Sequence, residues 1–446
     1  MYLHELTVAN LKLLRDMKIS FLHEGKPRPW TVFVGENGLC KTSLLRAIAL
    51  AATGPERGNQ LGTSYITTMP DKRREDAQVT IEATFGFSER LHRYREYPGL
   101  EEKPPHPPLL ESKLTTSTRL GVLRGSSRFV DASTRDPLPE GTQKGIDPLQ
   151  EARAAGLKLW FVAGYGVSRN IPQPLSTSSR VYVPVLDRLQ SLFDGLPLIA
   201  TDFVSRFDAN TAREFGAQLK KAFVDHELLP DVDDFLLMGR GGISDSKTFV
   251  EANRFAMRLP SGEKIRIPAL WMSQGYQSTI AWVVDLVAQV WSEAGEQVSL
   301  DEIEGLVLID EIDLHIHPTW QRGLIRALRH ALPRVQFVAT THSPMVLPGL
   351  ESHEIFILEA DQEGSVRWAQ SKQQPRLLTG GEIYERFFDI RSVYPEEHAQ
   401  KLHRYLRLAA DAYRSDAEEG EMSELRKWLQ TEGVPVAYEP VPREQV

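Results

Sequence analysis

A glycine-containing loop followed by a lysine and two hydroxyl residues is the first feature that could do chemistry. Residues 35–43 read GENGLCKTS and join an apolar run typical of a strand to a run spaced as a helix. In such a loop backbone N–H groups face a phosphate, Lys41 reaches the β- and γ-phosphates, and the Thr42 hydroxyl binds Mg²⁺. The usual pattern has a second glycine where this chain has Cys40, and its Cβ and sulfur could crowd the phosphates. The alternative is an ordinary turn before a helix.

Two adjacent acids form the second feature. Asp310 and Glu311 follow the apolar run Leu306–Ile309, and burying two carboxylates there is costly without a cation or hydrogen-bond donors. We therefore expect Asp310 to hold Mg²⁺ and Glu311 to polarise a water for in-line hydrolysis. The alternative is an acidic loop before the next helix. His315 and His317 are two residues apart and do not share a helix face, so we expect structural roles for both.

Two further segments have polar groups where a phosphate could bind. Ser273, Gln274 and Gly275 precede a long apolar helix, whose N-terminal N–H groups favour an anion. His342 follows the strand that comes after the acidic one and could donate a hydrogen bond to a γ-phosphate oxygen. Each segment alone also suits an ordinary turn or a structural histidine.

Strands and helices that alternate along the chain must position these residues. The run Trp30–Val34 is rich in β-branched residues, the runs Leu306–Ile309 and Val335–Ala339 are mainly apolar, and a helical pattern separates the last two. These features indicate a parallel sheet that is buried on both faces. Alternating patterns predict strands in residues 1–21 and 77–87 and a hairpin in residues 255–270, whereas residues 88–160 lack periodicity and residues 180–240 have helical spacing.

Composition excludes several classes of protein. The chain has 446 residues, a net charge of −8 and one cysteine, so neither a disulfide-stapled fold nor a chain that coats nucleic acid by bulk charge is expected. Charged residues interrupt the N-terminal 16 residues, and Asp285 interrupts the most apolar later stretch. No signal peptide or membrane span is therefore predicted, which favours a cytoplasmic protein without membrane partners.

In their order, the segments GENGLCKTS, WMSQGY, LVLIDEIDLHIHP and ATTHSP resemble ATP-binding-cassette ATPases of the SMC/RecF/OLD type. More narrowly, with the elements GYGVSR and RLQSLFDGL, the chain is similar to the AAA-family ATPases of anti-phage systems such as the Septu ATPase PtuA and retron ATPases. This resemblance implies an α/β P-loop NTPase fold: an ABC-type head with a mixed central sheet, an antiparallel β subdomain and a helical insertion. It covers residues 1–60 and 265–360 best.

The resemblance also implies roles and domains. It implies ATP and Mg²⁺ as cofactors, with Thr42 and Asp310 as metal ligands and Glu311, His342 and Lys41 as catalytic residues. The implied Walker A loop is Gly35, Glu36, Asn37, Gly38, Leu39, Cys40, Lys41, Thr42 and Ser43. Ser273, Gln274 and Gly275 become a signature that closes over the nucleotide of a second subunit, with Met272 in place of the usual leucine. The implied domains are an N-terminal lobe (1–87), an irregular and helical insertion (88–250), a C-terminal lobe (251–360) and a helical region (361–446).

Three functions remain open at this point. The chain could be an ATP-dependent regulatory subunit, in a homodimer or larger assembly, that controls an HNH-type partner nuclease and reaches nucleic acid through the complex. It could be a RecF/SMC-like repair ATPase that binds DNA itself, although its basic clusters at residues 72–74 and 90–95 are more typical of solvated faces. It could also be an ATP sensor with little turnover, because of Cys40. An amphipathic helix around Leu402, Leu406, Ala409 and Tyr413 could dock a partner, but packing on its own head is favoured.

Overall fold

The structure is a computed structural model, and it divides into two compact units, Met1–Leu377 and Leu378–Val446. It describes residues 1–74, 78–116, 121–141, 145–155, 157, 160–169, 171, 188–194, 198, 208–236, 254–294, 296–390, 395–433 and 440–442. Of the predicted helical run 180–240, most of residues 180–207 lies outside these residues, and so does part of the RLQSLFDGL element. No helix in the described residues is both long enough and apolar enough to cross a bilayer.

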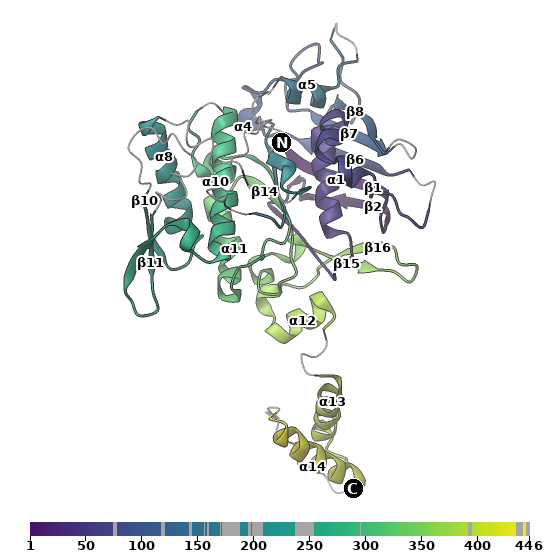
Figure 1. Ribbon diagram of the computed structural model, residues 1–446. Helices are drawn as coiled ribbons and strands as arrows, with labels where there is room; N and C mark the ends of the chain where they lie inside the picture. The colour runs from purple at the N-terminus through teal and green to yellow at the C-terminus, as the bar shows by residue number, and fades with distance from the viewer. Residues whose placement is uncertain are drawn as a thin grey trace. The chain divides into compact units, whose positions relative to one another are not determined.

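A six-stranded mixed sheet forms the centre of the first unit (Figure 1). Its order is β16 (Val366–Gln370), β15 (Ile355–Ala360), β5 (Trp30–Val34), β14 (Val335–Thr340), β13 (Gly305–Ile309) and β9 (Val162–Tyr165). All neighbours are parallel except β15 and β16. Every residue of β5, β13 and β14 is buried, which confirms the prediction of apolar strands covered on both faces.

Helix α1 (Lys41–Thr53) lies between this sheet and a second, antiparallel one. The second sheet has the order β2 (Leu14–Ser20), β1 (Tyr2–Leu11), β6 (Thr80–Gly86), β7 (Leu109–Thr116) and β8 (Leu123–Val130). One apolar cluster joins α1 to both sheets, and α1 ends at Gly54, whose φ is 78°. The helix that follows the phosphate loop is therefore fixed on two sides.

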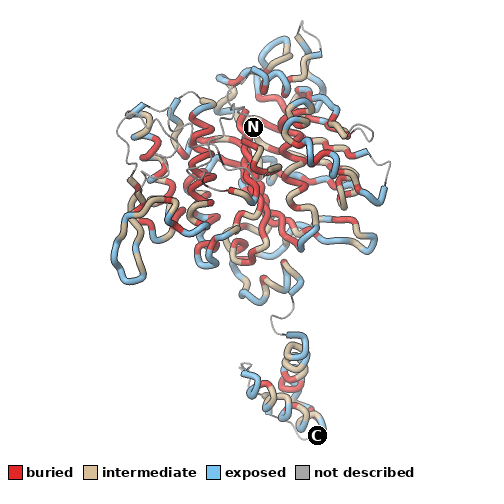
Figure 2. Tube along the Cα trace, viewed as in Figure 1, coloured by how far each residue is buried: buried red, intermediate tan, exposed pale blue. Residues whose placement is uncertain are grey.

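Further helices and small sheets complete this unit. Helices α10 (Gln274–Ala294) and α11 (Pro318–Ala331) lie on the side of the central sheet away from α1, and buried residues concentrate on these central elements (Figure 2). The hairpin of β11 (Arg254–Arg258) and β12 (Lys264–Ile267) confirms the predicted one and pairs with β10 (Val232–Leu236). The remaining elements are β3 (Leu22–His23), β4 (Lys26–Pro27), α2 (Pro55–Leu61), α3 (Thr63–Ile66), α4 (Glu89–His92), α5 (Pro148–Ala154) and α8 (Ala209–Lys220).

The prediction of an irregular segment over residues 88–160 is wrong. Strands β7 and β8 extend the antiparallel sheet there, and β9, inside the predicted insertion 88–250, joins the central sheet. Ser112 and Thr116 occupy inward-facing positions of β7, so the strand lacks the apolar alternation by which strands are recognised. The head also continues past the expected boundary at residue 360, because β16 pairs with β15 and the first unit ends at Leu377.

The second unit is helical and has its own small core. It contains α12 (Gly380–Phe388), α13 (Glu396–Ala410) and α14 (Asp416–Thr431). The last two helices bury Tyr405, Leu408, Ala409, Met422 and Leu429 against each other. The predicted face of Leu402, Leu406, Ala409 and Tyr413 is therefore wrong in part, because α13 ends before Tyr413, which is 66% exposed, and Leu406 is 38% exposed.

Candidate nucleotide-binding site

Three neighbouring strands end at the same edge of the central sheet, and a candidate site residue follows each. The register pairs Ile309 with Ala339 and Thr340 with Phe33, so the loops after β13, β14 and β5 begin at one level. The Thr42 hydroxyl donates to Asp310 Oδ2 at 2.8 Å, and the Thr340 hydroxyl donates to Asp310 Oδ1 at 2.6 Å. The Asp310 carboxylate is therefore held between helix α1 and strand β14.

Lys41 lies in the same place and is buried. Its Nζ donates to the carbonyl oxygens of Gly35 and Glu36, both at 2.7 Å. Burial lowers the pKa of Lys41 to about 8, and the charges of Asp310 and Glu311 partly oppose this effect. Burial also lowers the pKa of His342, and the charge of Lys41 lowers it further. Lys41, Asp310, Glu311 and His342, which are distant in the sequence, thus surround one location.

The loop between β5 and α1 offers free backbone donors. Within the described residues, the N–H groups of residues 38–43 donate no hydrogen bond. Gly38 has φ of 84° with open space where a Cβ would lie, whereas a Cβ on Gly35 would lie 2.7 Å from the Leu358 carbonyl oxygen. Gly38 therefore allows the left-handed turn, and Gly35 allows close contact with β15. Free N–H groups at a helix N-terminus form an anion-binding site.

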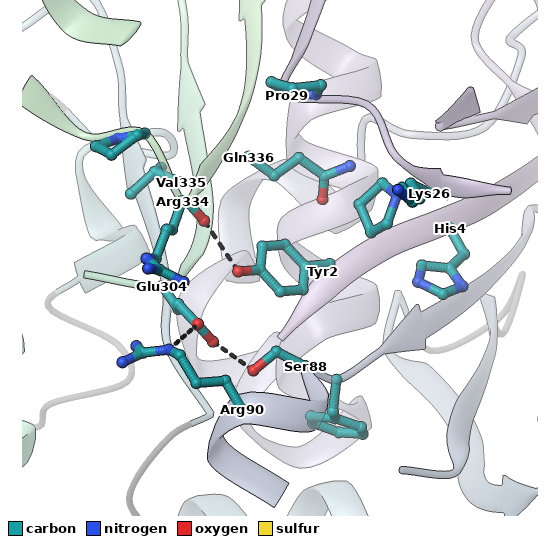
Figure 3. Close-up of a pocket in the computed structure, with 13 residues that line it drawn as sticks. Tyr2, His4, Lys26, Pro29, Ser88, Arg90, Glu304, Arg334, Val335 and Gln336 are labelled. Atoms are coloured by element: carbon teal, nitrogen blue, oxygen red, sulfur yellow. Dashed lines mark hydrogen bonds and ion pairs between the residues drawn. The ribbon is translucent and has the colours of Figure 1, made fainter. Parts of the chain in front are cut away.

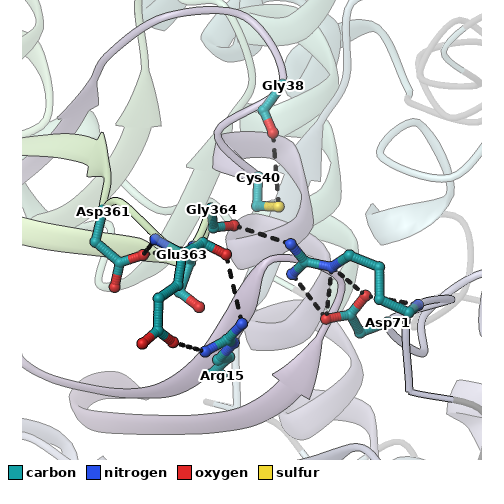
Figure 4. A network of polar contacts seen from close by, with 9 residues as sticks. Arg15, Gly38, Cys40, Asp71, Asp361, Glu363 and Gly364 are labelled. Atoms are coloured by element: carbon teal, nitrogen blue, oxygen red, sulfur yellow. Dashed lines mark hydrogen bonds and ion pairs between the residues drawn. The ribbon is translucent and has the colours of Figure 1, made fainter.

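Cys40 takes the left-handed conformation that a glycine adopts easily. Its φ is 62° and ψ is 19°, and its Sγ lies 3.8 Å from the Gly38 carbonyl oxygen. The thiol accepts a hydrogen bond from the backbone of Leu13, and burial raises its pKa. The side chain therefore faces the turn between β1 and β2, beside the polar network in Figure 4. Because a residue with a Cβ is disfavoured in this conformation, Cys40 adds about 1–2 kcal/mol of backbone strain relative to glycine.

The acidic loop is strained and firmly held. Glu311 has φ of 45°, and its N–H donates to the Thr340 hydroxyl at 2.7 Å. Arg169, which follows β9, donates to the carbonyl oxygens of Asp310 and Glu311. In the described part of the chain, the side chains of Glu311 and His342 make no hydrogen bond to protein, so both can meet a ligand.

Sequence reasoning missed Thr340 and Arg169 as site residues. Thr340 contacts both acids, and its signal was a hydroxyl residue at the end of an apolar strand. Arg169 belongs to the GYGVSR element, whose role could not be assigned from the sequence.

The signature segment packs against residues 315–316, which follow the acidic loop. Within the described residues, no hydrogen bond joins residues 273–275 to residues 35–43. The Gln277 amide donates to the carbonyl oxygens of Leu270 and Met272, and a Cβ on Gly275 would lie 2.4 Å from the His315 carbonyl oxygen. Ser273 lines a pocket of about 450 Å³ together with Pro230, Asp231, Tyr276, His315, Ile316, His317, Thr319 and Trp320. His317 also caps α11, accepting from the Thr319 N–H at 3.4 Å, which is the structural role that we expected.

The oxygen donors of Thr42 and Asp310 fit a magnesium ion. Mg²⁺ usually takes one or two protein oxygens and completes its shell with phosphates and water. The described residues contain no group of three or more His, Cys, Asp or Glu side chains arranged to hold a metal, so they offer no all-protein cage. The donor set therefore suits a metal that arrives with a nucleotide.

A second cavity, of about 440 Å³, lies at the opposite edge of the central sheet (Figure 3). Pro29, Glu304 and Val335, at or just before the starts of three central strands, help to line it. Glu304 accepts from the Ser88 hydroxyl and from Arg90 Nε, at 2.5 and 2.7 Å. These internal pairs hold α4 against the sheet, and the cavity is separate from the nucleotide site.

Comparison with known proteins agrees with this geometry. Septu protein PtuA of Bacillus mycoides is 25% identical over 433 residues, which are 96% of this chain and 50% of that protein. The Retron Ec83 probable ATPase of Escherichia coli is 30% identical over 138 residues, 31% of this chain and 24% of that protein. The chain thus spans about half the length of this PtuA, and its match to the retron ATPase covers about a quarter of that protein.

A solved structure shares the fold. The SmcHead bound to the C-winged helix domain of ScpA has a TM-score of 0.50 at 14% identity, covering 85% of this chain and all of that one.

A family model described as "AAA domain, putative AbiEii toxin, Type IV TA system" matches residues 30–347. The match covers well over half of the chain and includes the phosphate loop, the acidic loop and His342. The protein therefore belongs to this family of AAA-domain ATPases, with a P-loop head of the SMC type.

Proposed function

We propose that this protein is an ATP-binding and ATP-hydrolysing regulatory subunit of an anti-phage defence complex. The observation that carries the proposal is the convergence of Lys41, Asp310, Glu311 and His342 on one edge of the sheet beside six free backbone donors in residues 38–43. The oxygens of a triphosphate can accept hydrogen bonds from these free donors, and its negative charge can pair with Lys41.

Each residue has a distinct role in this proposal. Lys41 would leave the carbonyl oxygens of Gly35 and Glu36 and bind the β- and γ-phosphates. Glu311 would accept a proton from the attacking water, and His342 would donate a hydrogen bond to the γ-phosphate. Thr42 and Asp310 would hold magnesium, which supplies charge neutralisation at the phosphates.

The position of the signature supports a dimer of heads. Ser273 and Gly275 make no hydrogen bond to their own phosphate loop, and Ser273 lines a pocket that is open to a second molecule. In the proposal, this face closes over the ATP bound to a second copy of the chain, and interactions gained only in the closed state drive dimerisation. A homodimer or an assembly of dimers follows.

The defence role rests on the relatives, which are a Septu protein and a probable retron ATPase. In the proposal, the dimer controls a partner nuclease of the HNH type and reaches nucleic acid through the complex, in the cytoplasm. The absence of a nuclease motif from the sequence favours this division of labour. The C-terminal unit, with Leu406 and Tyr413 exposed, is the region that we propose for partner docking.

Two alternatives are less well supported. A repair ATPase that binds DNA itself needs free cations. In the two basic clusters Arg73 pairs with Asp71, Arg90 pairs with Glu304 and Arg95 is buried, which leaves only the exposed Lys72, Arg74 and Arg93 of these clusters for DNA. An ATP sensor without turnover was suggested by Cys40. The thiol faces the β1–β2 turn, which weakens that suggestion.

Phosphate release by the purified protein tests hydrolysis, with Glu311→Gln as the control. Turnover in the wild type that is lost in Glu311→Gln supports the proposal, and no wild-type turnover leaves only the sensor alternative. Sedimentation with ATP tests dimerisation, with Lys41→Ala as the nucleotide-binding control. Indistinguishable oligomers of the two proteins would contradict nucleotide-driven head pairing. Co-purification of the full-length protein with an HNH-type protein tests the partner.

A further inference from the structure

Arg169 is a buried cation, and every hydrogen bond that its side chain makes within the described residues goes to a neutral group. Its side chain is 2% exposed, and within the described residues it forms no ion pair. It donates to the carbonyl oxygens of Gly166, Asp310 and Glu311 and to the Ser278 hydroxyl on α10. A buried guanidinium without a bound carboxylate is costly, so its surroundings must stabilise it in another way.

The acidic loop provides that stabilisation through space. Asp310, Glu311 and Asp313 all act on Arg169 electrostatically, and all three raise its pKa against the larger lowering effect of burial. Burial lowers this pKa only to about 10, so Arg169 stays charged at neutral pH. With Lys41, it places two cations among three carboxylates. Arg169 and Lys41 therefore offset two of the three negative charges that an anionic nucleotide would meet here.

The backbone that Arg169 holds is the strained one. Glu311 has φ of 45°, a conformation that costs an L-residue about 1–2 kcal/mol. Its carbonyl oxygen accepts from Arg169 at 2.8 Å and from the Leu314 N–H at 2.9 Å. The same guanidinium reaches Ser278 at 3.3 Å, one turn after the signature segment. One side chain thus connects the acidic loop to the helix that carries the signature.

We propose that Arg169 is a positioning residue that holds the Asp310–Glu311 backbone in its left-handed turn, directs the Glu311 carboxylate at the nucleotide and fixes this turn to α10. The proposal rests on the proposed function, because it assigns Arg169 to the hydrolysis that Glu311 performs. Lysine keeps the charge, but its compact ammonium lacks the planar fork with which Arg169 reaches the carbonyl groups of the acidic loop and the Ser278 hydroxyl together. Arg169→Lys should therefore separate turnover from nucleotide binding.

Arg153→Lys is the matched control. Arg153 is also buried, and it donates to the carbonyl oxygens of Trp160 and Ala52, away from the acidic loop. We expect Arg169→Lys to lower kcat about 10–100-fold, as changes in supporting residues around reactive groups do, with the Kd for ATP changed less than about threefold. Arg153→Lys should leave both values unchanged. Equal turnover in wild type and Arg169→Lys would overturn the proposal, and so would parallel losses of kcat, ATP affinity and Tm in both lysine variants.

Hydrogen exchange gives a readout that does not need turnover. In Arg169→Lys, amides of residues 308–317 should exchange about tenfold faster while those of α1 do not change. Ser278→Ala removes one contact of Arg169, so it should have a smaller effect in the same segment and serves if Arg169→Lys does not fold. Unchanged exchange in this segment in every folded variant would refute the positioning role. A wild type without turnover would instead contradict the proposed hydrolysis and leave the exchange test intact.

Discussion

Replacing Cys40 by glycine tests whether the departure from the phosphate-loop pattern impairs nucleotide binding. Cys40 has φ of 62°, and its thiol faces Leu13 and Lys12 on the β1–β2 turn. Its side chain therefore does not enter the space beside the free N–H groups of residues 38–43. We expect Cys40→Gly to change the Kd for ATP less than about threefold, which is less than about 0.7 kcal/mol.

The expected effect on stability is also small, because opposing contributions nearly cancel. Glycine relieves about 1–2 kcal/mol of left-handed strain. It also increases the entropy of the unfolded chain, which costs about 0.4–1 kcal/mol, and it removes a half-buried CH₂–SH group, which costs about 0.5–1 kcal/mol. The free energy of unfolding should thus change by less than about 1 kcal/mol.

The assay is titration of a fluorescent ATP analogue, with thermal unfolding measured on the same samples. Cys40→Val is the matched control, since a β-branched residue tolerates positive φ poorly and should lower both Tm and affinity. An increase in affinity of tenfold or more in Cys40→Gly would refute the reasoning, because the native thiol would then obstruct the phosphates.

Three further predictions follow from the site. Burial lowers the pKa of Lys41 to about 8, so about half of the free protein carries this proton at pH 8. Because phosphates favour the charged form of Lys41, ATP binding should take up about half a proton at pH 8, little at pH 6.5, and none in Lys41→Arg. Calorimetry in buffers of different ionisation enthalpy measures this proton uptake. No uptake at pH 8 would contradict the prediction. Thr42→Val removes one of the two proposed magnesium ligands and should reduce the tightening of ATP binding by Mg²⁺ in the fluorescence titration. Equal tightening in the wild type and in Thr42→Val would show that the metal does not use this hydroxyl. Gly275→Ala should lower the free energy of unfolding, measured by chemical denaturation, by about 1–3 kcal/mol, because its Cβ would lie 2.4 Å from the His315 carbonyl oxygen. Gly323→Ala, which has open space on α11, should raise it by up to about 1 kcal/mol. Equal effects of the two variants would show that α10 does not need this close contact.

The elements around the site could be predicted because their patterns are local and strong. Strands β5, β13 and β14 are mainly apolar and fully buried, and Gly54–Pro55 marks the end of α1. Parallel strands place their carboxyl ends at one edge, which is why Lys41, Asp310 and His342 could be expected together.

The rest depended on contacts that a pattern does not contain. Strand β9 has four residues and includes a glycine, so only its pairing with β13 identifies it. The role of Arg169 depends on the fold that brings it to residues 310–311. The break between α13 and α14 did have a signal, because Ser415 and Glu418 form a capping box that begins α14.

The position of β5 in the central sheet has a consequence for biosynthesis. Its two neighbours are β14 and β15, and the earlier of these begins at residue 335, about 300 residues after β5 ends at residue 34. At about 5–20 residues per second, a ribosome needs about 15–60 s to make that stretch. Throughout this interval the nascent polypeptide exposes the apolar segment WTVFV without its native partners. The topology that creates the nucleotide site therefore delays completion of the central sheet until residues 335–360 have been made.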